Sequence, residues 1–184
     1  MKKTVSLVLC LAATIYTIWY MHFGVPYKNS GALSKIGIEH KALFVIWGVL
    51  TFAALAYSTA IAYIRYLKTK VYIPLLTVAG IGMALILAFD FDYSLKPDYY
   101  LHCTGSLAFS VIMGTTLFLL FLLNYKKSLM FKIFTYFTAA ILLIDLALLI
   151  IIKENALIEA LPIFAAYIML TAVNMRREKV EIKR

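Results

Sequence analysis

The chain alternates long apolar runs with short polar segments, a pattern that predicts an all-α membrane protein. Each run is close to the roughly 20 residues that a helix needs to cross the hydrocarbon core of a bilayer. A helix satisfies its own backbone hydrogen-bonding groups there, which an isolated extended segment cannot do. We therefore predict a polytopic six-transmembrane-helix bundle forming a single transmembrane domain over residues 1–184. The predicted spans are residues 4–23, 42–64, 71–89, 101–123, 129–152 and 158–175.

The first run follows Lys2 and Lys3 and could pass for a secretory signal peptide. A signal peptide has a shorter apolar stretch and ends at a small-x-small cleavage site. Here the run continues into His22 and Phe23 without such a site. We therefore expect this segment to remain as the first span.

Composition supports this class, since 64% of the residues are hydrophobic, 15% are charged and the mean hydropathy is +0.90. Such a chain cannot present a water-soluble surface. The net charge of +9 would suggest nucleic-acid binding in a soluble protein. Here the basic residues cluster at helix ends, as topology signals do, so no nucleic-acid partner is expected.

The distribution of basic residues predicts the orientation of the spans. If the spans alternate, 13 of the 18 Lys and Arg residues lie on one side, including those of the basic tail, residues 176–184. The positive-inside rule then places both termini in the cytoplasm (N-in/C-in). We expect the plasma membrane as the location. The five basic residues on the outer side are Lys28, Lys35, Lys41, Lys96 and Lys153.

Histidine and acidic side chains gather at the outer ends of the predicted spans. Five of them lie where three neighbouring helices reach the outer interface: Glu39, His40, Asp90, Asp92 and His102. Imidazole and carboxylate groups together suit a divalent metal or a general acid-base pair. Three interpretations stay open for this outer cluster: solvated or structural side chains, a site for a polar headgroup or small molecule, and a metal or hydrolytic centre.

Asp145 differs from the other acids because it lies within the fifth predicted span. Placing a carboxylate at that depth costs a few kcal/mol on insertion scales. One interpretation is a hydrogen bond that fastens two helices, with Tyr16 or Thr17 at similar depth as its partner. The other is a proton relay or substrate contact, since intramembrane acids are candidates for function.

Several familiar sites are absent from the sequence. The segment 90–98 spaces oxygen-bearing residues like a calcium loop, but Leu95 replaces the glycine of the turn and Leu101 replaces the bidentate glutamate. There is no nucleophile elbow, P-loop or HExxH sequence. Cys10 and Cys103 have no CxxC spacing. We therefore expect no cofactor, with a divalent metal at the outer cluster as the alternative.

Two segments resemble the six-span proteins of the Frag/DRAM/Sfk type. The stretch His102-Cys-Thr-Gly-Ser-Leu-Ala-Phe109 is similar to the histidine, glycine and phenylalanine pattern of that family, and residues 30–44 are similar to its first outer loop. The resemblance implies a six-span fold and a lipid-related role. Members of this group are associated with autophagy, remodelling of GPI-anchor lipids and plasma-membrane lipid organisation. His102 and Glu39 are the positions carried over, with no role attached.

These observations lead to three hypotheses. The first is a multi-pass membrane protein that engages lipid headgroups or a partner at its outer face, where the 24–41 loop is the only one long enough to act as a lid. The second is a metal-assisted lipid hydrolase or transferase that uses His40, His102 and Asp90. The third is a small transporter that uses Asp145. Membrane lipids are the expected partners, with a homo-oligomer or a protein partner also possible.

Overall fold

The computed structural model describes residues 2–176, and over these residues its regular structure is helical, which confirms the all-α part of the predicted fold class. Two short 3₁₀ turns, η1 (Asn29–Gly31) and η2 (Tyr125–Lys127), lie between helices. The seven α-helices are α1 (Lys2–Met21), α2 (Leu33–Glu39), α3 (Lys41–Tyr66), α4 (Tyr72–Ala88), α5 (Lys96–Leu123), α6 (Leu129–Ile152) and α7 (Ala156–Met175).

Five of these helices, α1, α3, α5, α6 and α7, are long and apolar enough to cross a membrane. Each coincides with one of the predicted spans to within a few residues at most ends. The remaining predicted span, residues 71–89, corresponds to α4, which has only 17 residues. At 1.5 Å per residue, α4 is about 26 Å long.

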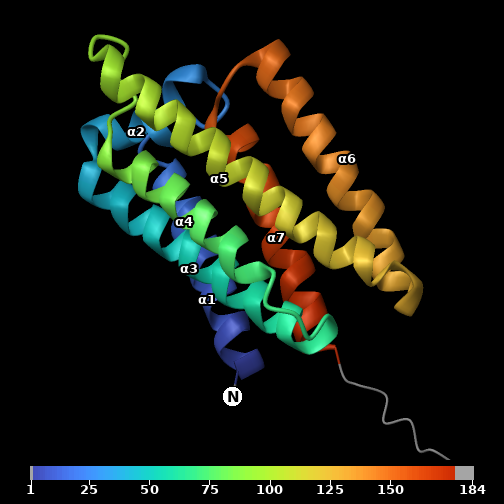
Figure 1. Cartoon of the computed structure of the whole chain (residues 1–184). Helices are drawn as coiled ribbons and strands as arrows, with labels where there is room; N and C mark the ends of the chain where they lie inside the picture. Colours follow the sequence, from blue (N-terminus) through green and yellow to red (C-terminus); the bar gives the residue numbers. More distant parts are fainter. Residues whose placement is uncertain (1, 177–184) are drawn as a thin grey trace, which may run out of the picture.

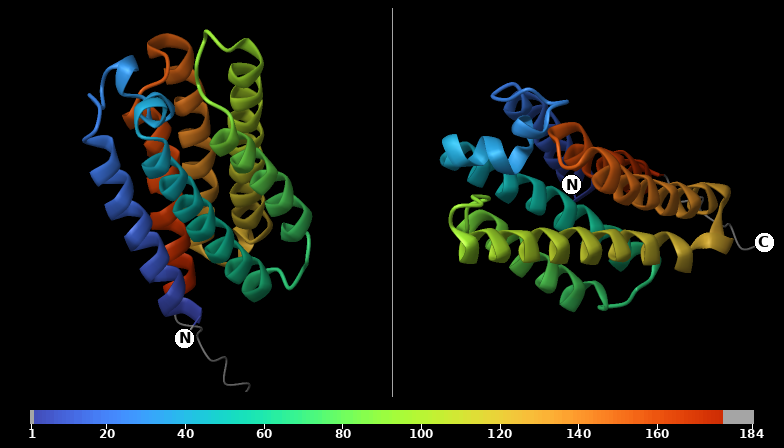
Figure 2. Two further views of the ribbon diagram at one scale, coloured as in Figure 1. Left: turned by 90° about the vertical axis from the view of Figure 1, so that its left-hand side faces the viewer. Right: turned by 90° about the horizontal axis from the view of Figure 1, so that it is seen from above.

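The long helices run side by side, and α7 lies in the middle of the bundle (Figure 1). It packs against α1, α3 and α6, and 56% of the residues in its most apolar stretch are buried. Helix α6 is at the opposite extreme, with 17% buried, and it contacts only α5, α7 and η2 closely. Figure 2 shows α4 and α5 stacked as a pair on one flank, while α1 lies on the far side of α3. The first described residues and the end of α7 meet at the same end of the bundle (Figure 1).

A buried polar network fastens three helices near that end. The Ser6 hydroxyl on α1 lies 2.8 Å from the Ser58 hydroxyl on α3. The Asn174 amide nitrogen on α7 donates to Ser6 Oγ and to the Ser58 carbonyl, each at 3.0 Å. All three residues are fully buried, so these hydrogen bonds satisfy groups that would otherwise be costly to bury.

Helices α4 and α5 approach closely because glycines face each other at their crossing. A Cβ atom on Gly82 would lie 2.8 Å from the Gly105 carbonyl oxygen and 2.7 Å from the Phe109 backbone nitrogen. A Cβ atom on Gly105 would likewise lie 2.7 Å from the Gly82 carbonyl oxygen. Small residues at such contacts let helix backbones pack directly against each other. The close approach of α4 and α5 therefore depends on Gly82 and Gly105.

The 24–41 segment is more ordered than a loop, because it contains η1 and α2. Tertiary contacts hold α2 in place over the ends of the long helices opposite the first described residues and the end of α7, and we refer to these as the outer ends, following the predicted orientation (Figure 1). The Tyr20 hydroxyl donates to the Leu33 carbonyl at 3.1 Å, and the Leu33 N–H donates to the Glu159 carboxylate at 2.7 Å. This segment thus forms a cap that α1 and α7 both anchor.

Candidate functional site

The two aspartates of the predicted outer cluster have partners outside it. Asp90 accepts a hydrogen bond from the Lys41 ammonium at 2.6 Å, within a part-exposed ion pair. Asp92 accepts from the Ser94 N–H at 2.8 Å, and this turn hydrogen bond lowers the pKa of the Asp92 carboxyl. Both side chains therefore act locally in the connection between α4 and α5.

Glu39 and His40 also have surroundings of their own. Glu39 is exposed at the end of α2, and the His40 ring packs 4.9 Å from the Phe23 ring. Over residues 2–176, none of these four residues forms a hydrogen bond with His102. No hydrogen bond thus joins His102 to the other members of the predicted cluster in the described structure, and Asp90 lies within electrostatic range of the His102 ring.

His102 is 1% exposed, with its ring between Phe44 and Phe91 at centroid distances of 6.2 and 5.2 Å. Its Nδ1 atom lies 2.9 Å from the Phe89 carbonyl oxygen, just past the end of α4. A carbonyl oxygen only accepts, so Nδ1 carries the proton in this contact. In the neutral ring, Nε2 is then an acceptor, and it is buried without a partner in the described structure.

Local sequence explains why His102 sits at this point. Gly105 is about one turn further along α5 and makes the close contact with Gly82 of α4. This contact brings the outer turns of both helices together, so the imidazole reaches the last carbonyls of α4. His102 therefore caps α4 with one nitrogen and holds the other toward the interior.

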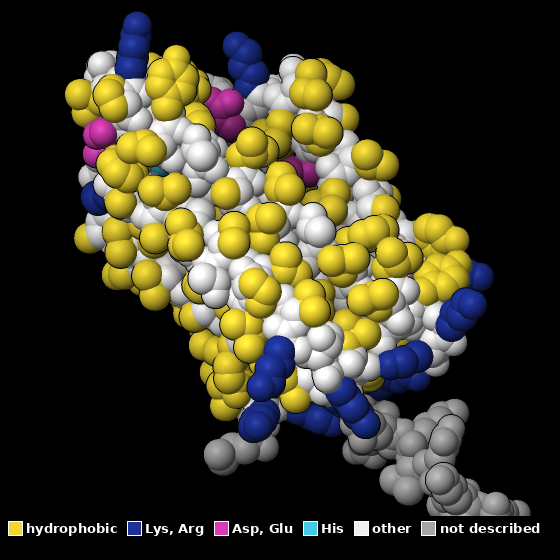
Figure 3. Space-filling view, viewed as in Figure 1, with side chains coloured by type: hydrophobic (Ala, Val, Ile, Leu, Met, Phe, Trp, Pro, Cys, Tyr) yellow, Lys and Arg dark blue, Asp and Glu magenta, His cyan; other side chains and the backbone are white. Residues whose placement is uncertain are grey.

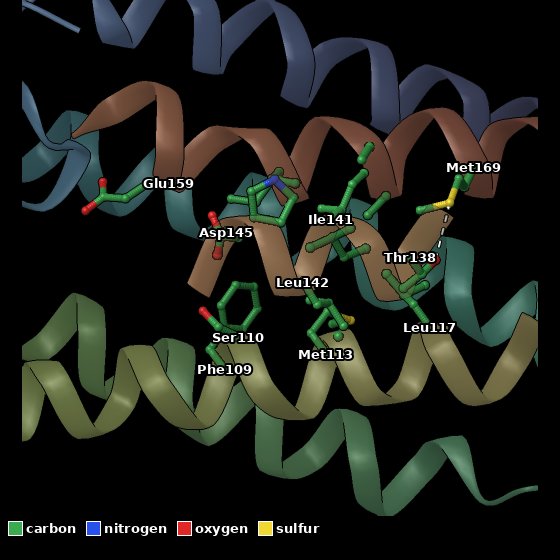
Figure 4. Close-up of a pocket in the computed structure, with 16 residues that line it drawn as sticks. Phe109, Ser110, Met113, Leu117, Thr138, Ile141, Leu142, Asp145, Glu159 and Met169 are labelled. Carbon is green, nitrogen blue, oxygen red and sulfur yellow. Dashed lines mark hydrogen bonds between the residues drawn. The ribbon is translucent and has the colours of Figure 1, made fainter. Parts of the chain in front are cut away.

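That second nitrogen belongs to a residue lining a cavity of about 350 Å³ in the outer half of the bundle. Carboxylates from two further helices line the same cavity, Asp145 from α6 and Glu159 from α7. Figure 4 shows Asp145 between α5 and α7, with Ser110 of α5 beside it. We define His102, Asp145 and Glu159 as the cavity triad, a set of residues from three helices.

Asp145 lacks the hydrogen bond expected for it. Its Oδ1 atom is buried and has no partner among the described residues. Tyr16 donates instead to the Leu43 carbonyl, and Thr17 donates to the Ala13 carbonyl. The expectation that Tyr16 or Thr17 pairs with Asp145 is therefore wrong, because both hydroxyls of α1 are occupied by backbone acceptors.

An ion pair closes the rim of the cavity on the side of the cap. The Lys35 ammonium lies 3.2 Å from the Glu154 carboxylate and 5.7 Å from the centre of the Phe91 ring. Burial opposes ionisation of Glu154, but hydrogen bonds from its surroundings, including those of Asn29 and Lys35, outweigh burial and lower its pKa. The rim thus carries a charged contact between α2 and the turn before α7.

The flank between α5 and α6 is more open. The buried residues of α6 end at Ile141, so the outer half of this helix packs loosely. Leu107 of α5 and Leu149 of α6 line the cavity, and the two residues are 67% and 39% exposed. Figure 3 shows carboxylates recessed among apolar side chains toward the outer end. The cavity therefore opens sideways, through an apolar flank.

A second cavity of about 90 Å³ adjoins the first and reaches deeper into the bundle (Figure 4). The two share Asp145, Glu159 and Ser110 among their lining residues. Below these residues the walls are almost entirely apolar, with Met113 and Leu117 on α5. Together the cavities form a space that is polar at its outer end and apolar further in.

The sequence indicated two members of the cavity triad, His102 and Asp145, but not Glu159. It also assigned no role to Glu154 at the rim. A signal for Glu159 was present in Glu-x-x-Pro, because Pro162 lacks an N–H and leaves the Ile158 carbonyl without its usual helical donor. An acid three residues before a proline, within a predicted span, therefore indicates a point where the hydrogen bonding of the helix is interrupted.

Comparison with known proteins finds no matching family model, no matching curated protein and no matching solved structure. Among residues 2–176, no group of three or more His, Cys, Asp or Glu side chains is placed to hold a metal ion. The geometry of the cavity is therefore the basis for the proposed function.

Proposed function

We propose that the chain is an integral membrane protein with six spans and both ends in the cytoplasm. Figure 3 shows Lys and Arg side chains gathered at the end where the termini lie, while the carboxylates lie toward the other end. This distribution supports the orientation, because basic residues are retained on the cytoplasmic side. A cysteine in place of the exposed Tyr27, in a Cys103→Ser background, should react from outside with a membrane-impermeant maleimide. A cysteine in place of Lys126 should not.

We further propose that the protein binds a membrane lipid, with the polar headgroup in the outer cavity and an acyl chain along the apolar part. The observation that carries this proposal is the sideways opening between α5 and α6, since a lipid can enter there without leaving the bilayer. The larger cavity, about 350 Å³, lies within the size range of sites for small organic groups. The resemblance to the Frag/DRAM/Sfk type points to the same class of ligand.

Trp47 supplies a probe for this test because it lines the larger cavity and is one of two tryptophans. Trp19→Phe removes the other one, which is exposed. Phospholipids brominated on the acyl chain should quench Trp47 fluorescence in the detergent-solubilised protein, saturating with lipid concentration.

A matched pair of variants separates cavity binding from general contact with lipid. Ser110→Phe fills the junction of the two cavities and should abolish saturable quenching. Val111→Phe changes the neighbouring residue, which is exposed and lines neither cavity, and should leave it intact. Equal quenching in both variants would refute the proposed site.

A lipid hydrolase or transferase is a second candidate, favoured by the anchored His102 ring. A general base needs a fixed tautomer and an available lone pair, which Nδ1 bonding and a free Nε2 supply. Mass spectrometry of lipids incubated with the protein, with EDTA and with His102→Gln as separate arms, tests this candidate. Product formation that survives His102→Gln would exclude His102 as the base, and loss with EDTA alone would indicate the metal-assisted form.

A further inference from the structure

The polar atoms without a partner at the outer cavity are all hydrogen-bond acceptors. His102 Nε2 is an acceptor because Nδ1 carries the ring proton, and it belongs to a side chain that is 99% buried. Asp145 Oδ1 is a buried carboxylate oxygen without a partner. The Ile158 carbonyl adds a third acceptor, since Pro162 cannot donate to it. These acceptors have no donor in the described structure, and the donors that line the same cavity are hydroxyl groups such as those of Ser106 and Ser110.

The charged side chains that line the outer cavity are acidic. Three carboxylates, those of Asp145, Glu154 and Glu159, line the outer cavity, and the lining contains no Lys or Arg. Glu154 is partly neutralised at the rim by Lys35, and Glu159 accepts the Leu33 N–H. Asp145 has no such compensation in the described structure. A carboxylate oxygen that is buried without a donor or cation is costly, and Asp145 Oδ1 is one, so a bound cation would stabilise this arrangement.

We propose that the lipid headgroup bound in the outer cavity carries a primary ammonium group, with Asp145 as its counter-ion and with His102 Nε2 and Glu159 among the acceptors that line the cavity. This inference rests on the proposed lipid-binding function and names the class of headgroup. An ammonium presents three N–H donors and one positive charge, which matches both the missing donors and the excess of acid. A neutral or anionic headgroup lacks the positive charge that would balance the carboxylates.

A quaternary ammonium fits this cavity less well than a primary one. Its methyl groups cover the nitrogen, so it carries the charge without any N–H donor and leaves the buried acceptors unpaired. The rim already shows the favoured chemistry in the chain's own residues. The Lys35 ammonium there pairs with Glu154 and lies over the Phe91 ring, so carboxylate and aromatic groups of this cavity accommodate a primary ammonium.

The test compares three phospholipids that share one brominated acyl composition, using Trp47 quenching in the Trp19→Phe protein. Phosphatidylethanolamine provides the primary ammonium, phosphatidylcholine the quaternary one, and phosphatidylglycerol neither. Hydrogen bonds to charged groups contribute enough that phosphatidylethanolamine should bind about tenfold or more tightly than each of the others. Equal affinity for all three, or preference for phosphatidylcholine or phosphatidylglycerol, would overturn the inference and leave lipid binding intact.

Conservative variants assign the preference to the cavity. Asp145→Asn and Glu159→Gln each remove one negative charge at constant size, and the Gln oxygen can still accept the Leu33 N–H. Both should reduce the preference for phosphatidylethanolamine about tenfold while phosphatidylglycerol binding persists. Glu39→Gln, an exposed acid outside the cavity, is the control and should keep the preference. An unchanged preference in both cavity variants would contradict the assignment.

Two further results distinguish failure of the ammonium preference from failure of lipid binding. Saturable quenching by none of the three lipids would refute lipid binding itself. Ethanolamine without acyl chains tests whether the amine must belong to a lipid, and it should displace brominated phosphatidylethanolamine only at far higher concentration. Displacement at equal concentration would show that a free amine is the ligand and would overturn the lipid headgroup.

Discussion

Replacement of Gly82 by alanine tests the contact that places His102. The added Cβ would lie 2.7 Å from the Phe109 backbone nitrogen and 2.8 Å from the Gly105 carbonyl oxygen, both of them main-chain atoms that cannot rotate away. Restoring ordinary van der Waals contact at 3.4 Å requires α4 and α5 to separate by roughly 0.7 Å, the difference between those distances.

The cost of this separation can be estimated from the packing. A gap of about 0.5–1 Å loses roughly a quarter to a half of the attraction in each affected atom pair, and each pair contributes about 0.1–0.2 kcal/mol. A few tens of pairs near the Gly82 crossing then lose about 1–3 kcal/mol, which matches the usual cost of overpacking. The higher helix propensity of alanine offsets up to about 1 kcal/mol. We expect a net loss of about 1–2 kcal/mol.

Gly80→Ala is the matched control because it lies two residues away on the same helix. Its Cβ would meet the tip of the Phe52 ring at 2.9 Å, and a side-chain tip can shift where a backbone cannot. Thermal unfolding in detergent micelles should show a melting temperature several degrees lower for Gly82→Ala than for Gly80→Ala, at roughly 2–4 °C per kcal/mol for a chain of this size. Equal melting temperatures would refute the argument that backbone contact at Gly82 sets the α4 and α5 pair.

Three further predictions concern the polar groups of the bundle. Ser6→Ala removes one acceptor of the buried amide on α7 and should lower the free energy of unfolding by about 0.6 kcal/mol, as measured by unfolding in mixed micelles. The lowered pKa of Glu154 means that its ion pair with Lys35 stabilises the rim above that pKa and is lost as the pH falls through it; acrylamide quenching of Trp47 in the Trp19→Phe protein should rise over the same acidic range, and a flat profile would contradict this. Asp145→Asn should yield stable protein and Asp145→Lys should not, because an amide imitates the hydrogen-bonding group while an ammonium adds a long charged chain beside apolar walls; equal yields after size-exclusion chromatography would show that Asp145 meets bulk water.

The helices were predictable because their apolar runs match the thickness of a bilayer, a constraint that leaves few alternatives. The start of α5 was less predictable from hydropathy, since the helix begins at Lys96, five residues before the predicted span. Pro97 at the first turn and Asp98 near the positive helix end explain this extension into polar sequence. These first-turn residues indicate where α5 begins, and hydropathy alone does not detect them.

Helix α2 could not be derived from local sequence because contacts distant along the chain stabilise it. Its seven residues, Leu33–Glu39, form no long apolar run, and the groups that hold it belong to Tyr20 and Glu159. The same limit applies to the site. Which side chains meet inside a bundle depends on the rotation of each helix, and one residue of register turns a side chain by about 100°. His102 and Asp145 were found because a histidine and an acid are unusual in such positions, whereas Glu159 required knowledge of the packing.

The shortness of α4 has a consequence for the lipid around the protein. A helix of about 26 Å is shorter than the roughly 30 Å hydrocarbon thickness of a typical bilayer, and its neighbour α5 is far longer. With α4 as one of the six proposed spans, we expect lipids next to it to compress or its flanking residues to enter the bilayer, at a cost that grows with each ångström of mismatch. We expect the bilayer to be thinnest along this flank. Membranes of short or disordered acyl chains should therefore have the smallest hydrophobic mismatch with the protein.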